Sequence, residues 1–535
     1  MANRRAWAVA AAIAASGALA ACGGSSNDAS PASADAAATT AAAGAAKDGG
    51  TLRVRIAADE GCLDPQQMRT RSQILLARQV VDSLTFQNEE GEIVPWLASA
   101  WKVNEDATRF TFTIRSDATF SDGSPVTAEV VKANLDGLVE MGAAASTAAP
   151  YLASYAGSSA TGDELTVRFR RPQAQFLQAT STPALGILSA QTLERSLGDR
   201  CAGEIVGSGP FTIGSYVRDA SLTLDRRPGY AWAPAGFANT GEAHLERIEV
   251  RMVPDGSVGT GMLLSGQIDL MADVPPQDVP RILDGGKQLT KRPNPGMATP
   301  FFPNIENAPL DELAVRQAIN LALDREQLVR TTLSPVESAA TAILSPTTPG
   351  YAPQPEYVRH DLDEAKRLLD EAGWVPGDDG IRQKDGKPLS VRIMYFTPAQ
   401  TPYLPFLQLA QQQLKEAGIG TKLQPVTITQ LVANERSGNY DLEYLGLTRG
   451  DPDVLNSKFA GYDARMDELL AALAAEADPA KRDAIAQQAQ DYAMQNAWTA
   501  PLHNFVYPTG HSEALHGLVF DDSNTPSLSE AWLDN

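Results

Sequence analysis

Three segments of the chain alternate hydrophobic and polar residues, which is the period of a strand with one buried face. They are residues 110–115 (FTFTIR), 248–252 (IEVRM) and 391–395 (VRIMY). In each segment every second side chain is a large apolar one, and the residues between them are mainly polar or charged. We predict a strand at each of the three.

Two other segments have the longer period of an amphipathic helix. In residues 311–333 apolar side chains recur every third and fourth position, which places them on one helical face. A second helix is predicted after Asp361, which is suited to cap it, with Glu364 three residues later as the capping-box partner and Gly373 as the left-handed stop. Because strand and helix patterns interleave along the chain, we expect sheets covered by helices.

Size and charge limit the classes of protein that remain. The chain has 535 residues, enough for about two to four folded units. Its hydrophobic content of 43% with 20% charged residues is that of a folded protein rather than a disordered one. The net charge of −21 argues against nucleic acid as a partner.

The first 50 residues have the composition of an export signal followed by a tether. Residues 1–21 start with Arg4 and Arg5, continue through a short apolar run, and end in small residues before Cys22. The ending Leu-Ala-Ala-Cys resembles the lipobox of bacterial lipoproteins, which implies cleavage before Cys22 and a diacylglycerol group on its sulfur. The alternative is an ordinary secreted protein in which Cys22 is incidental. Residues 22–50 are mainly Ala, Ser, Gly and Thr, and we predict a disordered tether there.

Export and lipidation together predict the location of the protein. Removal of both signal arginines would take the net charge from −21 to −23. No later apolar stretch has the length of a transmembrane helix, so the lipid is the expected anchor. We therefore expect an extracytoplasmic protein on the outer face of the cytoplasmic membrane, periplasmic if the cell has an outer membrane.

Two cysteines remain for the folded body if Cys22 carries the lipid. Cys62 and Cys201 would then be an even pair in an oxidising compartment, which favours a disulfide. Two separate buried thiols are the alternative, since the sequence does not give the distance between them.

Sequence signatures of catalysis and of metal binding are scarce. The chain has no Gly-x-Ser-x-Gly, no Walker loop, no His-Glu-x-x-His and no paired-cysteine zinc spacing. His503, His511 and His516 lie close in sequence, but their spacing matches no known ligand pattern, so solvated or core histidines are favoured. An enzyme is therefore the weaker hypothesis, and neither a cofactor nor a metal is expected.

The longer motifs carry a family resemblance. Leu63-Asp64-Pro65 is followed, within residues 80–131, by VVDSLTFQNEEGEIVPWLASAWKVNEDATRFTFTIRSDATFSDGSPVTAEVV. Further motifs come in order: GSGPFTIGSY, LERIEVRMVPD, LLSGQIDL, AVRQAINLALDREQLV, HDLDEAKRLLDEAGW, NYDLEYLG and APLHNFVYPTGHSEALHGL. Together they closely resemble the family 5 extracytoplasmic solute-binding proteins, the oligopeptide, dipeptide and nickel receptors of ABC importers.

The resemblance implies a fold and a function. The fold would be the α/β periplasmic-binding-protein type (type II, cluster C), with two hinged lobes and an extra subdomain on lobe I. Lobe I would take residues 51–290 and 505–535, with the subdomain at about 80–190, and lobe II residues 291–504. The function would be capture of a peptide or peptide-like solute between the lobes, by a monomer, and delivery to an ABC permease.

One stretch departs from the pattern of the peptide receptors. In that family an acidic side chain that holds the peptide's amino terminus usually precedes an acidic-Pro pair, which corresponds here to Asp451-Pro452. The preceding residues are 447–450, Leu-Thr-Arg-Gly, with no carboxylate. A buried ammonium without a counter-charge is costly, whereas Arg449 is suited to a carboxylate or phosphate. Arg69 and Arg71 follow the Leu-Asp-Pro motif, in a loop that lines the cleft in peptide-binding members.

These residues lead to a hypothesis about the ligand: it carries an anionic group or is a peptide without an exposed amine. The alternative for each arginine is a pair with a local acid such as Asp82 or Asp453. Nearby positions complete the expected ligand-binding set, which is Arg69, Thr70, Arg71, Tyr151, Thr448, Arg449, His503, Asn504 and Phe505. Two alternative functions remain open: the same fold binding a non-peptide anionic solute (opine-, sugar-acid- or phosphate-like), and a sensory or structural lipoprotein.

Overall fold

The computed structural model describes residues 45–397, 399–521 and 523–534. The predicted signal, Cys22 and most of the predicted tether lie outside these described residues. The first described residues already contact the folded body, because Gly49 N donates to the His244 carbonyl at 2.8 Å and Lys47 pairs with Asp534 at 2.8 Å. In the part of the chain that the structure describes, no helix has the length and apolarity to cross a membrane.

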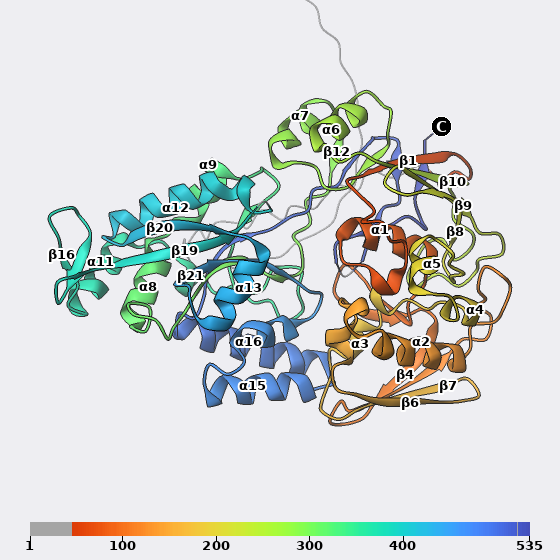
Figure 1. Cartoon of the computed structure of the whole chain (residues 1–535), viewed down its shortest axis with the longest axis horizontal. Helices are drawn as coiled ribbons and strands as arrows, with labels where there is room; N and C mark the ends of the chain where they lie inside the picture. The colour runs from red at the N-terminus through yellow and green to blue at the C-terminus, as the bar shows by residue number, and fades with distance from the viewer. Residues whose placement is uncertain (1–44, 398, 522, 535) are drawn as a thin grey trace, which may run out of the picture. The chain divides into compact units, whose positions relative to one another are not determined.

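A seven-stranded mixed sheet is the centre of what we call lobe I (Figure 1). Its strands, in spatial order, are β12 (Gln288–Leu289), β24 (Gly510–His511), β11 (Leu270–Met271), β1 (Thr51–Ile56), β10 (Arg247–Met252), β9 (Ser221–Arg226) and β8 (Phe211–Val217). Strand β1 runs parallel to β10 and β11, whereas the other neighbours are antiparallel. Helices that belong to this part are α1 (Arg71–Val80), α4 (Ala190–Leu193), α5 (Leu197–Cys201), α6 (Gly256–Leu264) and α7 (Val279–Asp284).

A second, antiparallel sheet lies within the sequence of lobe I. Its strands are β4 (Ala98–Val103), β5 (Arg109–Ile114), β7 (Glu164–Phe169) and β6 (Tyr155–Thr161), and α2 (Ala128–Met141) packs against β6 and β7. Alternate residues of β5 and β7 point inward, where Phe110, Phe112 and Phe169 meet Phe176 of α3 (Phe176–Ala179). Each ring has a neighbour in this set, with centroids of the contacting pairs 4.7 to 6.3 Å apart, so this sheet has an aromatic core of its own.

Lobe II is built on a six-stranded sheet. In spatial order its strands are β15 (Ser338–Ala339), β23 (Ala500–Asn504), β14 (Thr299–Pro303), β21 (Leu442–Tyr444), β19 (Ser390–Phe396) and β20 (Gly420–Val426). Its longer helices are α8 (Leu313–Ala322), α9 (Arg325–Thr332), α11 (Leu362–Glu371), α12 (Leu404–Glu416), α13 (Ile428–Ser437), α15 (Ala464–Ala475) and α16 (Pro479–Gln495). Figure 1 shows α15 and α16 side by side, and they share a second apolar cluster of this lobe.

The remaining elements are short. The strands are β2 (Thr85–Gln87), β3 (Ile93–Pro95), β13 (Gly296–Met297), β16 (Val375–Pro376), β17 (Arg382–Lys384), β18 (Lys387–Pro388), β22 (Leu447–Thr448), β25 (Leu515–His516), β26 (Val519–Phe520), β27 (Pro526–Ser527) and β28 (Trp532–Leu533). The helices are α10 (Pro355–Val358) and α14 (Asn456–Phe459), with 3₁₀ turns η1 (Pro65–Gln67), η2 (Gly142–Ala145), η3 (Ala149–Leu152), η4 (Pro183–Leu185), η5 (Pro276–Asp278), η6 (Thr401–Tyr403) and η7 (Pro452–Leu455).

Two segments carry the chain from one large sheet to the other. The first follows β12 and leads to β14, and the second follows β23 and leads to β24. They run beside each other, since Asn294 N donates to the Phe505 carbonyl at 2.8 Å and Asn294 Oδ1 accepts from Tyr507 N at 3.2 Å. We refer to residues 290–298 and 505–509 as the crossing segments.

The three predicted strands are confirmed as β5, β10 and β19. The predicted helix at 311–333 is instead two helices, because the backbone of Leu323 is extended and Asp324 caps α9 by accepting from Gln327 N at 2.9 Å. Periodicity did not reveal the break because apolar residues continue through it.

The cap predicted at Asp361 is confirmed, since its carboxylate accepts from Glu364 N at 3.0 Å. The predicted left-handed stop is confirmed as well, because Gly373 has a φ of +86°. Glu364 does not complete a capping box, however: its carboxylate accepts from Arg367 at 2.6 and 2.7 Å instead.

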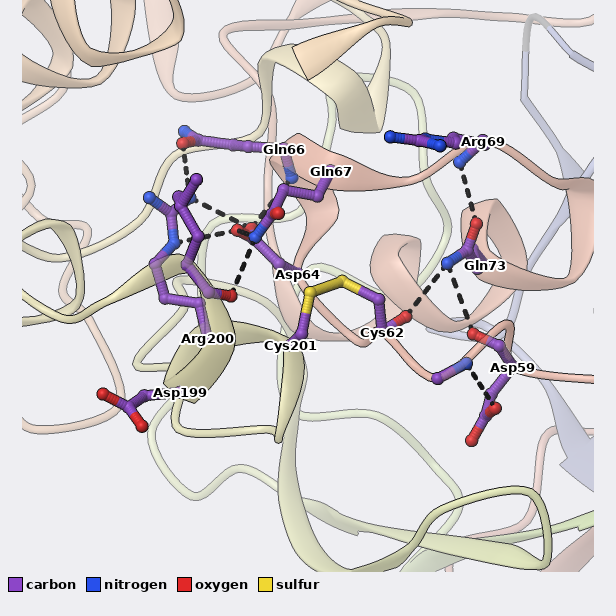
Figure 2. Close-up of a disulfide and its surroundings, with 12 residues drawn as sticks. Asp59, Cys62, Asp64, Gln66, Gln67, Arg69, Gln73, Asp199, Arg200 and Cys201 are labelled. Atoms are coloured by element: carbon purple, nitrogen blue, oxygen red, sulfur yellow. Dashed lines mark hydrogen bonds and ion pairs between the residues drawn. A yellow bond between two sulfur atoms is a disulfide. The ribbon is translucent and has the colours of Figure 1, made fainter. Parts of the chain in front are cut away.

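Cys62 and Cys201 form a disulfide that ties the segment after β1 to the end of α5 (Figure 2). A buried ion pair lies beside it, with Arg200 Nε 2.8 Å from Asp64 Oδ2 and Arg200 Nη2 2.7 Å from Gln66 Oε1. The bridge and the pair therefore hold the same two segments together.

Asp82 is a carboxyl group enclosed in the core of lobe I. The Trp232 indole donates to Asp82 Oδ2 at 2.8 Å, and the Asp82 side chain has no exposed surface. Burial raises the pKa of Asp82 to about 7, against the opposing effects of Trp232 and of the Arg227 charge.

This raised pKa predicts a loss of stability with rising pH. Between about pH 4 and pH 7 the unfolded Asp82 has lost its proton while the native one keeps it, so stability falls by up to about 1.4 kcal/mol per pH unit. Asp82→Asn keeps the acceptor for Trp232 and is expected to remove this contribution. Chemical denaturation at a series of pH values tests it, and parallel pH profiles for the two proteins would contradict it.

Candidate ligand-binding site

A cavity of about 270 Å³ lies where the strands of lobe II meet the crossing segments. Four elements contribute from the lobe II sheet: the start of β14 and the ends of β19, β21 and β23. The cavity is lined by Asn294, Met297, Thr299, Phe396, Ala399, Gln400, Tyr403, Tyr444, Leu445, Gly446, Leu447, Thr448, His503, Phe505 and Tyr507. We call it the strand-end pocket.

Aromatic rings make up much of the wall of this pocket. Tyr403 has its ring centroid 6.1 Å from that of Tyr444 and 6.2 Å from that of Phe505, and Phe505 lies 4.5 Å from Tyr507. The described lining contains no Asp, Glu, Lys or Arg. Its polar groups are amides, hydroxyls and one imidazole, which suit an uncharged or partly apolar ligand surface.

Close backbone packing fixes one side of the pocket. Strands β13 and β22 pair at Gly296 and Thr448, where a Cβ on Gly296 would lie 2.1 Å from the Leu447 carbonyl. Because Gly296 also has a φ of +116°, no other residue fits this position without movement. The loop after β19 is held by Gln400, whose amide donates to the Tyr444 carbonyl at 2.8 Å.

A buried carboxylate lies behind the aromatic wall. His503 Nε2 is 2.7 Å from the Tyr444 hydroxyl, and its Nδ1 is 2.8 Å from Glu337 Oε2. The side chains of Glu337 and His503 are 2% and 0% exposed, so this contact is shielded from water. Burial, followed by the Glu337 charge, raises the pKa of Tyr403, which keeps its hydroxyl protonated.

Three of the nine predicted ligand-binding residues line this pocket, namely Thr448, His503 and Phe505. Asn504 is the neighbour of His503 on β23, and successive strand residues point to opposite faces. Its amide donates to Ser338 Oγ at 3.1 Å and to the Ala339 carbonyl at 3.2 Å, outside the pocket.

The three predicted residues around Arg69 are arranged differently from one another. Arg69 is exposed, and Thr70 caps α1 by accepting from Gln73 N. Arg71 donates to the Asn524 carbonyl at 2.6 Å, lies 3.6 Å from Asp273, and stacks its guanidinium 4.7 Å from the centre of the Tyr507 ring. None of the three lines the strand-end pocket, although Arg71 contacts one of its walls from outside.

Arg449 and Tyr151 meet each other rather than the pocket. Arg449 Nη1 is 2.6 Å from Asp453 Oδ2, and its guanidinium lies 5.2 Å from the centre of the Tyr151 ring. The neighbouring Gly450 carbonyl accepts from Gln87 of lobe I at 2.9 Å. This part of the stretch that departs from the peptide receptors therefore contacts lobe I, and Asp453 is the local acid that pairs with Arg449.

A second buried pair supports the same stretch. Arg482 binds both carboxylate oxygens of Asp451, at 2.5 and 2.7 Å. Burial, together with the Asp451 charge, raises the pKa of the nearby Asp453 to about 7.

Several pocket residues were not predicted from the sequence, notably Phe396, Tyr403, Tyr444 and Tyr507. For Phe396 the available signal was an aromatic residue directly after the predicted strand at 391–395, and the same signal describes ordinary core residues. Tyr403, Tyr444 and Tyr507 lie in no strand predicted from the sequence. No group of three or more His, Cys, Asp or Glu residues suited to a metal ion occurs among the described residues. His511 and His516 are partly exposed. His511 Nδ1 donates to the Ser512 carbonyl at 3.1 Å, and His516 Nε2 lies 3.0 Å from Asp534 Oδ2.

Comparisons with known proteins agree with this fold. The family model for bacterial extracellular solute-binding proteins, family 5, matches residues 92–464. The glutathione-binding protein GsiB of Shigella dysenteriae is 24% identical over 494 residues, which cover 89% of this chain and 92% of GsiB. The probable D,D-dipeptide-binding periplasmic protein DdpA of Escherichia coli K12 is 25% identical over 450 residues, covering 79% of this chain and 82% of DdpA.

A solved structure shows the same fold. NikA from Brucella suis in complex with Fe(III)-EDTA superposes with a TM-score of 0.77 at 22% identity, covering 91% of this chain and all of NikA. The architecture is thus the mixed α/β periplasmic-binding-protein fold of the cluster C receptors.

The chain belongs to family 5 of the bacterial extracellular solute-binding proteins. Members of this family are transport receptors and not enzymes, so the protein is an extracytoplasmic receptor that binds a small solute for an ABC transporter.

Proposed function

We propose that this receptor captures a peptide or peptide-like solute in the strand-end pocket and delivers it to an ABC permease while a lipid on Cys22 anchors it. The observation that carries the proposal is the pocket itself, with aromatic rings, amides and hydroxyls but no charged side chain in its described lining. Such a lining suits amide groups and apolar side chains together. The names of GsiB and DdpA, which refer to glutathione and to D,D-dipeptides, support the same class of solute.

The alternative of an anionic solute held by the arginines has less support. Arg71 and Arg449 both have acidic partners, at 3.6 and 2.6 Å, and Arg69 lies outside the pocket lining. A guanidinium already paired with a carboxylate offers less to an incoming anion, because binding must compete with that pair.

The strand-end pocket is lined in part by the crossing segments, which connect the two lobes. Asn294, Met297, Phe505 and Tyr507 belong to the crossing segments, while the other lining residues come from lobe II. A solute in the pocket therefore touches the segments through which any rotation between the lobes must pass.

Native mass spectrometry of the gently purified protein tests the proposal. We expect a co-purified peptide-like solute, and Phe505→Ala is expected to weaken its binding at least tenfold, since the substitution removes an aromatic wall contact. The matched control is Tyr351→Ala, which removes a partly buried aromatic residue of the same lobe outside the pocket. Equal loss in both variants, unchanged binding in Phe505→Ala, or a solute of another class would contradict the proposal.

The intact mass of the protein purified from cell membranes tests the proposed lipid anchor on Cys22. A mass consistent with cleavage before Cys22 and an added diacylglycerol is expected. An unmodified Cys22 would show an ordinary secreted protein instead.

A further inference from the structure

The charged groups around the strand-end pocket bear on the charge of the ligand group that the pocket binds. Its described lining has no charged residue, yet the charges just outside the lining are unequal. On one side Arg71 is matched by Asp273 at 3.6 Å and donates to backbone carbonyls. On the other side Glu337 has a single ion-pair partner among the described residues, which is His503.

We propose that the strand-end pocket binds a cationic substituted-ammonium group of the solute, with the aromatic rings as its walls and Glu337, behind His503, as the source of negative potential. This inference rests on the proposed function and adds the charge of the bound group. It replaces the expectation from the sequence that the ligand is anionic or lacks an exposed amine, because a carboxylate is supplied by a segment far from residues 447–450.

The aromatic wall is the first support. The face of an aromatic ring is the negative end of its quadrupole, and clustered rings are a common site for substituted ammonium groups. Phe396, Tyr403, Tyr444, Phe505 and Tyr507 all line the pocket. One ring of this wall already holds a cation, since the Arg71 guanidinium lies 4.7 Å from the centre of Tyr507.

The position of Glu337 is the second support. Strand β15 pairs with β23 so that Ala339 is opposite His503, which places the preceding loop beside the pocket wall. Val336 is buried in a cluster with Val506 and with apolar residues of lobe I, and Glu337 N donates to the Ser334 carbonyl at 3.0 Å. The carboxylate is therefore held in place by the packing on both sides of it.

The polar contacts of Glu337 and His503 are the third support. Glu337 Oε2 and His503 Nδ1 are 2.8 Å apart, but neither atom completes a hydrogen bond among the described residues. Within the described part of the chain, Glu337 Oε2 is thus left without a hydrogen-bond donor behind a wall that the rings already make attractive to cations.

Three probes of similar size separate charge from shape. Choline (cation) and 3,3-dimethylbutan-1-ol (neutral) are the isosteric pair, and 3,3-dimethylbutanoate is an anion of similar size with its charge at the opposite end. Binding is measured by titration with ligand-detected NMR on the purified protein after removal of co-purified solute. We expect choline to bind at least tenfold more tightly than the alcohol and the anion to bind least. Equal affinity for choline and the alcohol, no detectable choline binding, or preference for the anion would overturn the inference.

Variants link the preference to the named residues. Glu337→Gln is expected to reduce choline affinity about tenfold and to leave the alcohol unchanged. The matched control, Glu326→Gln, removes an exposed carboxylate of α9 and is expected to change neither. If Glu337→Gln does not fold, Tyr403→Leu serves instead and should weaken choline more than the alcohol. If the variant that folds, Glu337→Gln or its substitute Tyr403→Leu, still prefers choline to the alcohol as strongly as the wild type does, that result would also overturn the inference.

The two proposals fail in different ways. If the pocket is not the recognition site, the natural solute remains bound in Phe505→Ala whatever the probes show. If only the charge assignment is wrong, the natural solute is lost from Phe505→Ala while choline gains nothing over the neutral alcohol.

Discussion

Replacing Cys62 and Cys201 together with serine is expected to lower the free energy of unfolding by about 4–5 kcal/mol, the chain-entropy value for a closed loop of 139 residues. The disulfide holds the segment after β1 against the end of α5, so the unfolded chain gains the freedom of everything between them. Guanidinium denaturation of the oxidised protein and of the double variant measures the difference.

The control for this prediction is the reduced wild-type protein, which has the same loop open but keeps both sulfur atoms. It should match the double variant within about 1 kcal/mol, because the loss is attributed to the open loop and not to the side chains. A loss under about 1 kcal/mol in both would mean that the adjacent Asp64–Arg200 pair and backbone contacts already hold the two segments together.

Arg482→Met is expected to destabilise the protein by about 3–5 kcal/mol, because it leaves Asp451 buried without its counter-charge. The side chains of Arg482 and Asp451 are 11% and 5% exposed, and the pair has two contacts, at 2.5 and 2.7 Å. The loss of Arg482 also leaves Asp453 close to an uncompensated carboxylate. Denaturant unfolding at pH 7.5 measures the effect.

A matched double variant distinguishes charge from packing. Arg482→Met with Asp451→Asn removes both charges and keeps an acceptor for the η7 cap, where Asp451 receives the Asp453 N–H at 2.8 Å. We expect it to recover more than half of the lost stability. No recovery would show that Arg482 acts mainly through its packing.

The same variant has a functional consequence. The residues just before Asp451 include Leu447 and Thr448, which line the strand-end pocket, and Arg449, which contacts Tyr151 of lobe I. Loosening this stretch should therefore weaken the binding of the natural solute as well as the fold.

Local patterns of the sequence were sufficient for much of the secondary structure. Alternation of apolar residues predicted β5, β10 and β19, and a capping aspartate and a glycine predicted both ends of α11. These features depend on neighbours along the chain, so short windows contain the necessary information. The one helix placed wrongly, at 311–333, failed because an extended Leu323 is compatible with continued apolar periodicity.

The motifs also led to the correct family, but long-range packing decided which residues meet at the site. Arg449 was a reasonable candidate for an anion because no carboxylate precedes it in residues 447–450. The structure brings Asp453 to it within one turn, and Tyr151 from lobe I. A pairing of that kind depends on the rotamers and packing of both partners, which sequence spacing does not specify.

From sequence alone came the prediction of an export signal with its cysteine, one strand in each of three sheets, the family, and the pair of cysteines available for a disulfide. The tertiary structure decided the strand-end pocket, because its rings come from the ends of separate strands, from η6 and from a crossing segment. It also decided that Glu337, more than 150 residues from His503 in the sequence, lies 2.8 Å from it. The physical reason is that a buried charge takes its effect from distance and dielectric surroundings, and both are set only when the sheet brings distant segments together.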